Sequence, residues 1–268
     1  DVYQLVTSAT FRDDTNDLSE APIDALSTHN FKDDIERSGV GIYTWGGWMD
    51  ETMADAAIRR LLTYSNPQRT VVGPWNHGGG RHASQYLPSG TPTDPSTERQ
   101  WLECVKFFDY YLKDIDNGVM SEKILIYYTM GEEKWKLTNV WPPAGSSQTR
   151  WHLADNHELS QAEPSAESRA DTYKIDFDAT TGATNRWHTQ LGGDDVIYGD
   201  RAEQDRRLLT YTSAPLSEDL EITGHPVVTL YVASTHADGA FFVYLEDVDE
   251  SGKVTYLTEG QLRALHRK

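Results

Sequence analysis

The sequence is poor in cysteine and in basic residues, and it lacks any long apolar run. The one cysteine among 268 residues, Cys104, excludes intrachain disulfide bonds and multi-cysteine zinc sites. Lys and Arg number 24 against 42 Asp and Glu, which gives a formal net charge of −18. Because this balance offers phosphates no positive field, we expect no nucleic-acid partner. No stretch approaches ~18 consecutive apolar residues, so we expect no membrane span.

Other properties leave more than one interpretation open. A single cysteine suits either side of a membrane, so the compartment, cytoplasmic or secreted, is undetermined for an expected soluble protein. The first residue is Asp1 and not Met, and no basic-plus-apolar signal segment follows it, which favours a processed or excised piece. The acidic balance is compatible with salt adaptation and equally with an ordinary acidic protein.

What the sequence does contain is enough apolar material for a packed core. Apolar residues make up 38% of the chain and aromatic residues 11%, and the length predicts about two domains. We expect loops and short helices over residues 1–37, and then buried strands over 40–45 and 69–73, each followed by a helix. This order predicts a parallel sheet with right-handed crossovers.

The second of these helices has a predicted start and a predicted apolar face. Asp94 is the expected N-cap, with Pro95 at the first helical position and Gly118 as a C-terminal cap. The apolar face is expected to comprise Trp101, Cys104, Val105, Phe108, Tyr111, Leu112 and Ile115.

After about residue 120 helical periodicity gives way to short strands separated by Gly, Asp and Ser clusters. This pattern predicts an all-β sandwich. The expected strands cover 124–128, 149–153, 172–177, 208–212, 227–233, 241–247 and 253–258.

Two chemically active side chains follow the first two strands. Asp50 comes after the strand that ends in Gly46-Gly47, and His77 comes after the strand that ends at Gly73. Ligands of open α/β sheets bind outside the carboxyl ends of the strands, where these two side chains would meet. Acid before histidine is also the order of the last two members of a Ser…Asp/Glu…His triad. The alternative is that Asp50 only caps the helix starting at Glu51 and that His77 is a polar loop residue.

A serine nucleophile is missing from this sequence. No G-x-S-x-G occurs, and the nearest match, at 145–149, lacks the second glycine and follows the histidine. Either the triad interpretation is wrong, or the nucleophile lies outside this chain and upstream of Asp50. We therefore expect the chain to begin after the nucleophile.

Several segments together resemble the second half of the CocE/NonD serine hydrolases, a family that includes cocaine esterase, α-amino-acid ester hydrolases and X-prolyl dipeptidyl aminopeptidases. They include GGWMD (46–50), GPWNHG (73–78) and FFDYYLK (107–113). The resemblance continues through YTMGEEKW (128–135), WPP (141–143), FFVYLEDV (241–248) and TEGQLR (258–263).

The resemblance implies α/β plus all-β architecture. Residues 1–119 would be the C-terminal part of an α/β-hydrolase domain with a remnant of its cap, and 120–268 a truncated jelly-roll β-sandwich. Asp50 would be the triad acid and His77 the triad base. Trp48 and Trp75 would flank them as structural or pocket residues, and Phe241 and Phe242 would approach the substrate from the sandwich. The resemblance also implies that the nucleophile and oxyanion residues lie outside this chain.

The predicted function is therefore that of part of a serine hydrolase cleaving ester or amide acyl bonds, as an esterase, acylase or X-Pro dipeptidyl-peptidase. The substrate would be a small ester, amide or peptide, and the chain alone is expected to be inactive. The expected protein partner is the missing N-terminal half or a second copy in a homo-oligomer. The alternative is a non-catalytic β-sandwich module that binds a carbohydrate or protein.

No cofactor or metal is expected. His29, His77 and His82 have no fixed spacing that would make them zinc ligands. Residues 247–252 imitate the opening of a calcium loop, but position twelve is Thr258 and the flanks are strand-like, so we predict a turn between strands.

Overall fold

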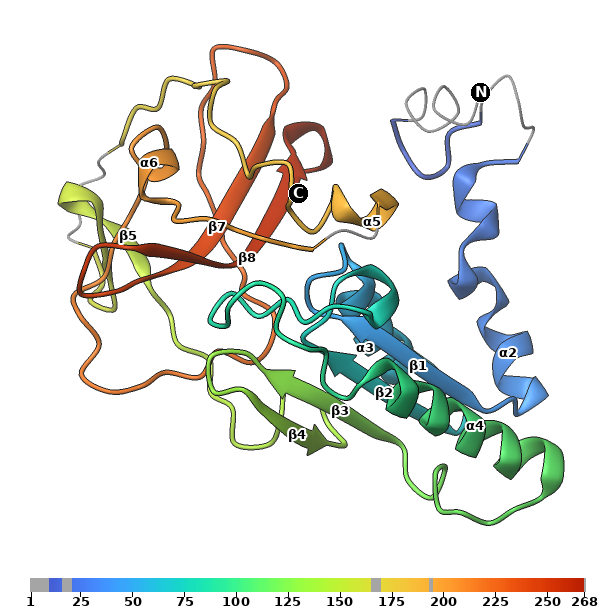
Figure 1. Cartoon of the computed structure of the whole chain (residues 1–268). Helices are drawn as coiled ribbons and strands as arrows, with labels where there is room; N and C mark the ends of the chain where they lie inside the picture. The colour runs from blue at the N-terminus through green and yellow to red at the C-terminus, as the bar shows by residue number, and fades with distance from the viewer. Residues whose placement is uncertain (1–9, 16–20, 165–169, 193–194, 268) are drawn as a thin grey trace.

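The computed structural model describes residues 10–15, 21–164, 170–192 and 195–267 of the chain. The lower half of Figure 1 shows a four-stranded sheet with its helices, and the upper half shows a β-rich part. Of the N-terminal region predicted as loops and short helices, the described part forms η1 (Ile23–Leu26), η2 (Thr28–Phe31) and α2 (Lys32–Ser38). The remainder of that prediction lies outside the described residues.

The sheet has the strand order β1-β2-β3-β4. β1 (Ile42–Gly47), β2 (Gln68–Gly73) and β3 (Ile124–Thr129) run parallel, and β4 (Lys134–Thr138) is antiparallel to β3. The parallel pairing predicted for the first two strands is therefore confirmed. The strand at 124–128 was expected in the sandwich, but its pairing with β2 places it in this sheet. The domain boundary at residue 120 stays a prediction.

Helices cover both faces of the sheet. α3 (Met53–Thr63) packs through Ala57, Ile58 and Leu61 onto Val72 and Leu125, and these residues belong to the main core. α4 (Thr97–Lys113) lies on the other face, in front of the sheet in Figure 1. Adjacent side chains of a strand point to opposite faces. A Cβ added at Gly46 would accordingly meet Met53 at the start of α3, whereas one added at Gly41 would meet Tyr111 of α4.

The start of α4 differs from the prediction by two residues. Its N-cap is Ser96, whose side chain accepts a hydrogen bond from the Arg99 N–H. Asp94 serves other partners, since its carboxylate accepts from Trp135 Nε1 at 2.9 Å and its carbonyl from Trp75 Nε1 at 3.1 Å. The helix ends before Asp114, which adopts the left-handed conformation, and not at Gly118.

The predicted apolar face of α4 is also only partly correct. Phe107 and Tyr111 face the sheet, where Phe107 lies 5.7 Å from the ring of Tyr43. Most of the other predicted members are exposed, Trp101 by 67% and Leu112 by 75%. The helix thus carries two apolar stripes, of which one faces the sheet and the other is largely exposed.

The C-terminal part contains less regular structure than predicted. Its strands form two antiparallel pairs, and no strand is assigned over the predicted ranges 172–177, 208–212 and 227–233, all of which are described. A sandwich face with few paired strands leaves apolar side chains in water, and Val227 is 85% exposed. Its elements are β5 (His152–Ala154), η4 (Asp155–His157), β6 (Glu158–Ser160), α5 (Thr189–Gly192), α6 (Ala202–Asp205), β7 (Ala240–Val248), β8 (Val254–Arg263) and η5 (Ala264–His266), whereas η3 (His77–Gly79) belongs to the loop after β2.

The hairpin of β7 and β8 shows two features that bear on the site. Residues 249–253 form its turn, in which Asp249 Oδ1 accepts from the N–H groups of Ser251 and Lys253, so the predicted turn is confirmed. At the other side, Tyr256 of β8 packs with Met49 and Ala83 in a second apolar cluster. This cluster joins the β-rich part to the carboxyl edge of the parallel sheet.

Candidate functional site

The ends of β1 and β2 approach each other unusually closely. A Cβ added at Gly47 would lie 2.2 Å from the Trp75 carbonyl oxygen, and one added at Gly73 would lie 2.5 Å from the Trp75 ring. The N–H of Met49 donates to the Trp75 carbonyl at 3.1 Å, which ties the loop after β1 to the loop after β2. Glycine is therefore required at Gly47, where the two backbones touch, and at Gly73, where the Trp75 ring leaves no room for a side chain.

Asp50 and His77 meet at this junction. His77 Nδ1 lies 3.0 Å from Asp50 Oδ1. An ionised carboxylate only accepts hydrogen bonds, so Nδ1 carries the proton and Nε2 of the neutral ring is left as the acceptor. The Asp50 side chain is 9% exposed and that of His77 is 49% exposed. A buried carboxylate thus contacts an imidazole that is half exposed to solvent.

The alternative, in which Asp50 only caps the following helix, is wrong, because its carboxylate makes no capping hydrogen bond. The N-cap of α3 is Thr52, and no side chain donates or accepts a capping hydrogen bond there. Asp50 contributes only its backbone carbonyl, which accepts from the Met53 N–H at 2.8 Å. Its carboxylate is instead directed to His77, as a histidine-orienting acid requires.

Both tryptophans that flank the pair have packing partners within the protein. Trp48 Nε1 donates to the Tyr128 carbonyl at 2.7 Å, and its ring lies 6.3 Å from Trp141. Trp75 is 2% exposed and stacks on Trp45 at 5.4 Å. These contacts hold the two strand ends in place. A contribution of Trp48 or Trp75 to a substrate pocket stays a prediction.

Strand alternation distinguishes the two phenylalanines of β7. Phe242 shares a face with Tyr244, which packs against the cluster that contains Met49, the neighbour of Asp50. Phe241 points to the opposite face. Phe242 is 58% exposed, so its ring is accessible on the side of the hairpin that carries Tyr244. A role of either residue in substrate binding stays a prediction.

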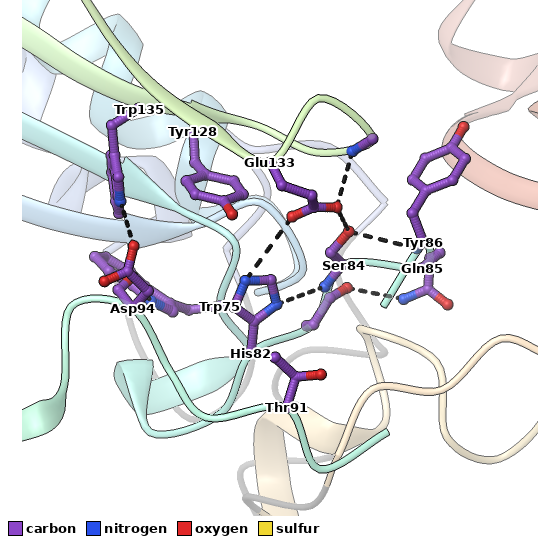
Figure 2. A network of polar contacts seen from close by, with 12 residues as sticks. Trp75, His82, Ser84, Gln85, Tyr86, Thr91, Asp94, Tyr128, Glu133 and Trp135 are labelled. Carbon is purple, nitrogen blue, oxygen red and sulfur yellow. Dashed lines mark hydrogen bonds and ion pairs between the residues drawn. The ribbon is translucent and has the colours of Figure 1, made fainter. Parts of the chain in front are cut away.

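The sequence analysis missed a polar cluster beside the site, shown in Figure 2. Glu133, in the turn between β3 and β4, accepts a hydrogen bond from Ser84 Oγ at 2.5 Å, and His82 Nε2 lies 4.0 Å from its other oxygen. The side chain of His82 is 2% exposed, and this burial lowers its pKa. The negative charges of Glu133 and Asp94 act in the opposite direction but are the smaller effect. The signal in the sequence is weak, because isolated polar residues in a loop are common.

The three histidines considered as metal ligands have separate partners. His29 contacts Arg12 and Asp24, whereas His77 contacts Asp50 and His82 lies beside Glu133. Within the described residues, no group of three or more His, Cys, Asp or Glu side chains is placed to hold a metal ion. None of the described helices combines the length and the apolar character that crossing a membrane needs.

Comparison with known proteins places the chain in a family. A model of the X-Pro dipeptidyl-peptidase C-terminal non-catalytic domain matches residues 117–268. Two proteins whose names assign them provisionally to the serine esterases, from Mycobacterium bovis (strain ATCC BAA-935 / AF2122/97) and Mycobacterium tuberculosis (strain CDC 1551 / Oshkosh), are each 42% identical over 288 residues. The chain belongs to the CocE/NonD-like family.

More distant relatives agree with this assignment. Cocaine esterase of Rhodococcus sp. (strain MB1 Bresler) is 27% identical over 238 residues, covering 83% of this chain and 40% of that protein. A crystal structure of an aminopeptidase from a marine sediment Thaumarchaeota archaeon superposes with a TM-score of 0.67 over 85% of this chain and 41% of that one. At 21% identity this likeness shows a shared fold and nothing about activity.

The CocE/NonD-like relatives are longer than this chain. The two mycobacterial proteins match all of it, but the match covers only 45% of their own length. The named relatives are esterases, so the family is one of hydrolases. Asp50 and His77 lie before residue 117 and thus outside the segment that matches the non-catalytic domain.

Proposed function

We propose that this chain is part of a serine hydrolase that cleaves ester or amide acyl bonds, with His77 as general base and acid and Asp50 as the residue that orients it. The observation that carries this proposal is the 3.0 Å contact between Asp50 Oδ1 and His77 Nδ1 at the carboxyl ends of two parallel strands. The esterase names of the relatives support the same class of reaction.

The chemistry follows from the tautomer. His77 Nε2 would take the proton of a serine hydroxyl while the serine oxygen attacks the acyl carbon. The resulting imidazolium is stabilised by the Asp50 carboxylate and returns the proton to the departing alcohol or amine. A water molecule then repeats the sequence on the acyl-enzyme, which releases the acid and restores the serine.

The serine must come from polypeptide outside residues 1–268, since this chain has no G-x-S-x-G. Two surfaces suit such a segment. β1 pairs only with β2 among the described strands, so one edge is open to another parallel strand. On the adjacent face, α4 presents an exposed apolar stripe at i, i+4, i+7 and i+11 spacing, formed by Trp101, Val105, Phe108 and Leu112.

The β-rich part would contribute to the acyl pocket and not to bond cleavage. Phe242 is the stronger candidate of the two phenylalanines, because its face of β7 is the one that packs toward Met49 and the site. We propose a domain boundary near residue 120, with a hydrolase part before it; after it, β3 and β4 complete the four-stranded sheet and a jelly-roll sandwich follows them. Whether the acyl group is that of an ester, an amide or an X-Pro peptide depends on residues outside this chain.

Substitution of the two site residues in the full-length protein tests the proposal. We expect Asp50→Asn to lower kcat by about 10⁴-fold, because the carboxamide no longer fixes the base tautomer or stabilises the imidazolium. His77→Ala should lower kcat by at least about 10³-fold. Hydrolysis of aryl esters of increasing acyl length measures both. Near-normal turnover in either variant would remove the assignment.

A second His–Asp pair in the same chain provides a matched control. His225 Nε2 lies 2.8 Å from Asp55 Oδ1, but both side chains are about 40% exposed and neither follows a strand of the sheet. Asp55→Asn and His225→Ala should leave kcat unchanged. A fluorophosphonate probe should label the full-length protein and not residues 1–268 alone. Labelling of the short chain would contradict the location given to the nucleophile.

A further inference from the structure

The loop that carries His77 folds back on itself. After β2, the chain reaches His77 and returns so that Trp75 and His82 form an isolated antiparallel bridge. The Ala83 N–H then donates to the Pro74 carbonyl at 2.7 Å. His77 therefore sits at the tip of a narrow excursion, and its position depends on where the return arm, residues 81–86, is held.

The return arm is anchored on one side by the carboxylate of Glu133. Figure 2 shows Ser84 Oγ donating to Glu133 Oε1, which also accepts from the Gly131 N–H at 3.0 Å. The Ser84 N–H donates to His82 Nδ1 at 3.3 Å, which leaves the proton of the neutral ring on Nε2, the nitrogen beside Glu133. Burial and the adjacent Glu133 carboxylate raise the pKa of Tyr128, whose ring packs edge-on against His82.

On its other side the return arm contacts the loop of the triad acid and the β-rich part. Ala83 packs in one cluster with Met49, the residue before Asp50. Gln85 Oε1 accepts from the Tyr198 N–H at 3.0 Å, and the Tyr86 hydroxyl donates to Asp247 at 3.2 Å. The arm therefore lies between Glu133 and the surfaces that support both members of the Asp50–His77 pair.

We propose that Glu133 is a positioning residue for His77: it accepts the Ser84 hydroxyl, which fixes the return arm and thereby the 3.0 Å contact of His77 with Asp50. This inference rests on the proposed function, because it assigns no chemistry to Glu133 itself. A displacement of about 1 Å in a catalytic group costs about 10²-fold in rate even when the substituted residue is remote.

The test uses the full-length enzyme and a matched pair of adjacent glutamates. Glu133→Ala should lower kcat by about 10–100-fold with KM changed by less than about threefold, since the arm and not the acyl pocket is released. Glu133→Gln keeps an acceptor oxygen for Ser84 and should recover most of kcat. Glu132→Ala removes the neighbouring carboxylate, which pairs with Lys134 and Lys136, and should leave kcat unchanged.

A spectroscopic readout on the full-length protein reports the same contact independently of turnover. The Nδ1–H proton of His77, hydrogen-bonded to Asp50, should give a far-downfield proton resonance that His77→Ala removes. Glu133→Ala and Ser84→Ala should each broaden or shift this resonance. The double variant should change the resonance no more than either single variant, because both substitutions remove the same Ser84–Glu133 hydrogen bond. Glu132→Ala should preserve it.

The outcomes separate the two proposals. If His77→Ala keeps normal turnover, the proposed function fails whatever Glu133 does. If His77→Ala is inactive while Glu133→Ala retains wild-type kcat and the downfield resonance, the positioning role is overturned. Should Glu133→Ala fail to fold, as judged by circular dichroism, Ser84→Ala decides, and wild-type kcat in that variant again overturns the inference.

Discussion

Substitution of Gly47 by alanine tests whether the close contact of the two strand ends holds the site together. The added Cβ would lie 2.2 Å from the Trp75 carbonyl oxygen and 2.8 Å from the carbonyl carbon. Cβ atoms essentially never come within 3.0 Å of such neighbours, so the Trp75 backbone must move by about 0.8 Å. Two residues later the same loop carries His77.

Gly46 supplies the control, because it lies on the same strand and has the same gain in backbone rigidity. Its Cβ would be 3.4 Å from the nearest atom, an ordinary contact with the Met53 carbonyl oxygen. Neither glycine requires a left-handed backbone, so both alanines gain about 0.5–1 kcal/mol from lower unfolded-state entropy. The difference between Gly47→Ala and Gly46→Ala therefore isolates the steric cost, about 1–3 kcal/mol.

Thermal unfolding of residues 1–268 measures that difference. At about 2–4 °C per kcal/mol for a chain of this size, Gly47→Ala should melt roughly 5 °C below Gly46→Ala. Hydrolysis by the full-length Gly47→Ala enzyme should fall by about 10²-fold, because His77 is displaced from Asp50. Equal melting temperatures together with equal turnover would show that the strand ends do not depend on this contact, and the account of the site would be wrong.

Three further predictions follow from single contacts. Burial lowers the pKa of His82 in the folded protein, so the unfolded state binds more protons once the pH falls below the ordinary histidine pKa of about 6.5. The free energy of unfolding should therefore fall as the pH drops through that value, by at most about 1.4 kcal/mol per pH unit. In urea denaturation measured over a series of pH values, His82→Gln should reduce this pH dependence. Trp48→Phe removes the donor to the Tyr128 carbonyl and should cost about 1 kcal/mol in the same assay, and no loss would mean that the indole N–H is not bonded there. Leu112→Glu should leave the melting temperature of residues 1–268 unchanged, because the Leu112 side chain is 75% exposed. In the full-length protein the same substitution should abolish hydrolysis, because a charge would lie in the interface proposed for the α4 stripe. Full activity of that variant would exclude this interface.

The sequence predicted the parallel sheet and the meeting of Asp50 with His77 because both depend on local order along the chain. The connection from one parallel strand through a helix to the next is almost always right-handed. It brings the carboxyl ends of the two strands to the same edge of the sheet. The start of α4 was misplaced by two residues because Asp94 and Ser96 are both good N-caps. Only the tertiary contacts of Asp94 with Trp75 and Trp135 separate them.

Errors in the C-terminal part have a different cause. The segments 172–177 and 227–233 are predicted as strands because turn residues separate them from their neighbours, but a strand also needs a hydrogen-bonding partner, and a partner distant in sequence leaves no local signal. The α4 helix shows the same limit. Its apolar residues surround much of the helix, so periodicity alone does not tell that Phe107 faces the sheet and Leu112 faces outward.

The adjacent glutamates of the β3–β4 turn show why the support of the site is harder to predict than its chemistry. Glu132 and Glu133 are identical in type, and both follow Gly131 in a turn. Glu133 adopts a left-handed backbone, with φ of 56°, and its carboxylate lies beside Ser84 and His82, whereas Glu132 pairs with lysines at the surface. The two carboxylates therefore have different surroundings although the residues are adjacent and chemically identical. Asp50 and His77 are recognisable because their chemistry restricts their type and order, but a positioning residue needs only an acceptor atom in the right place.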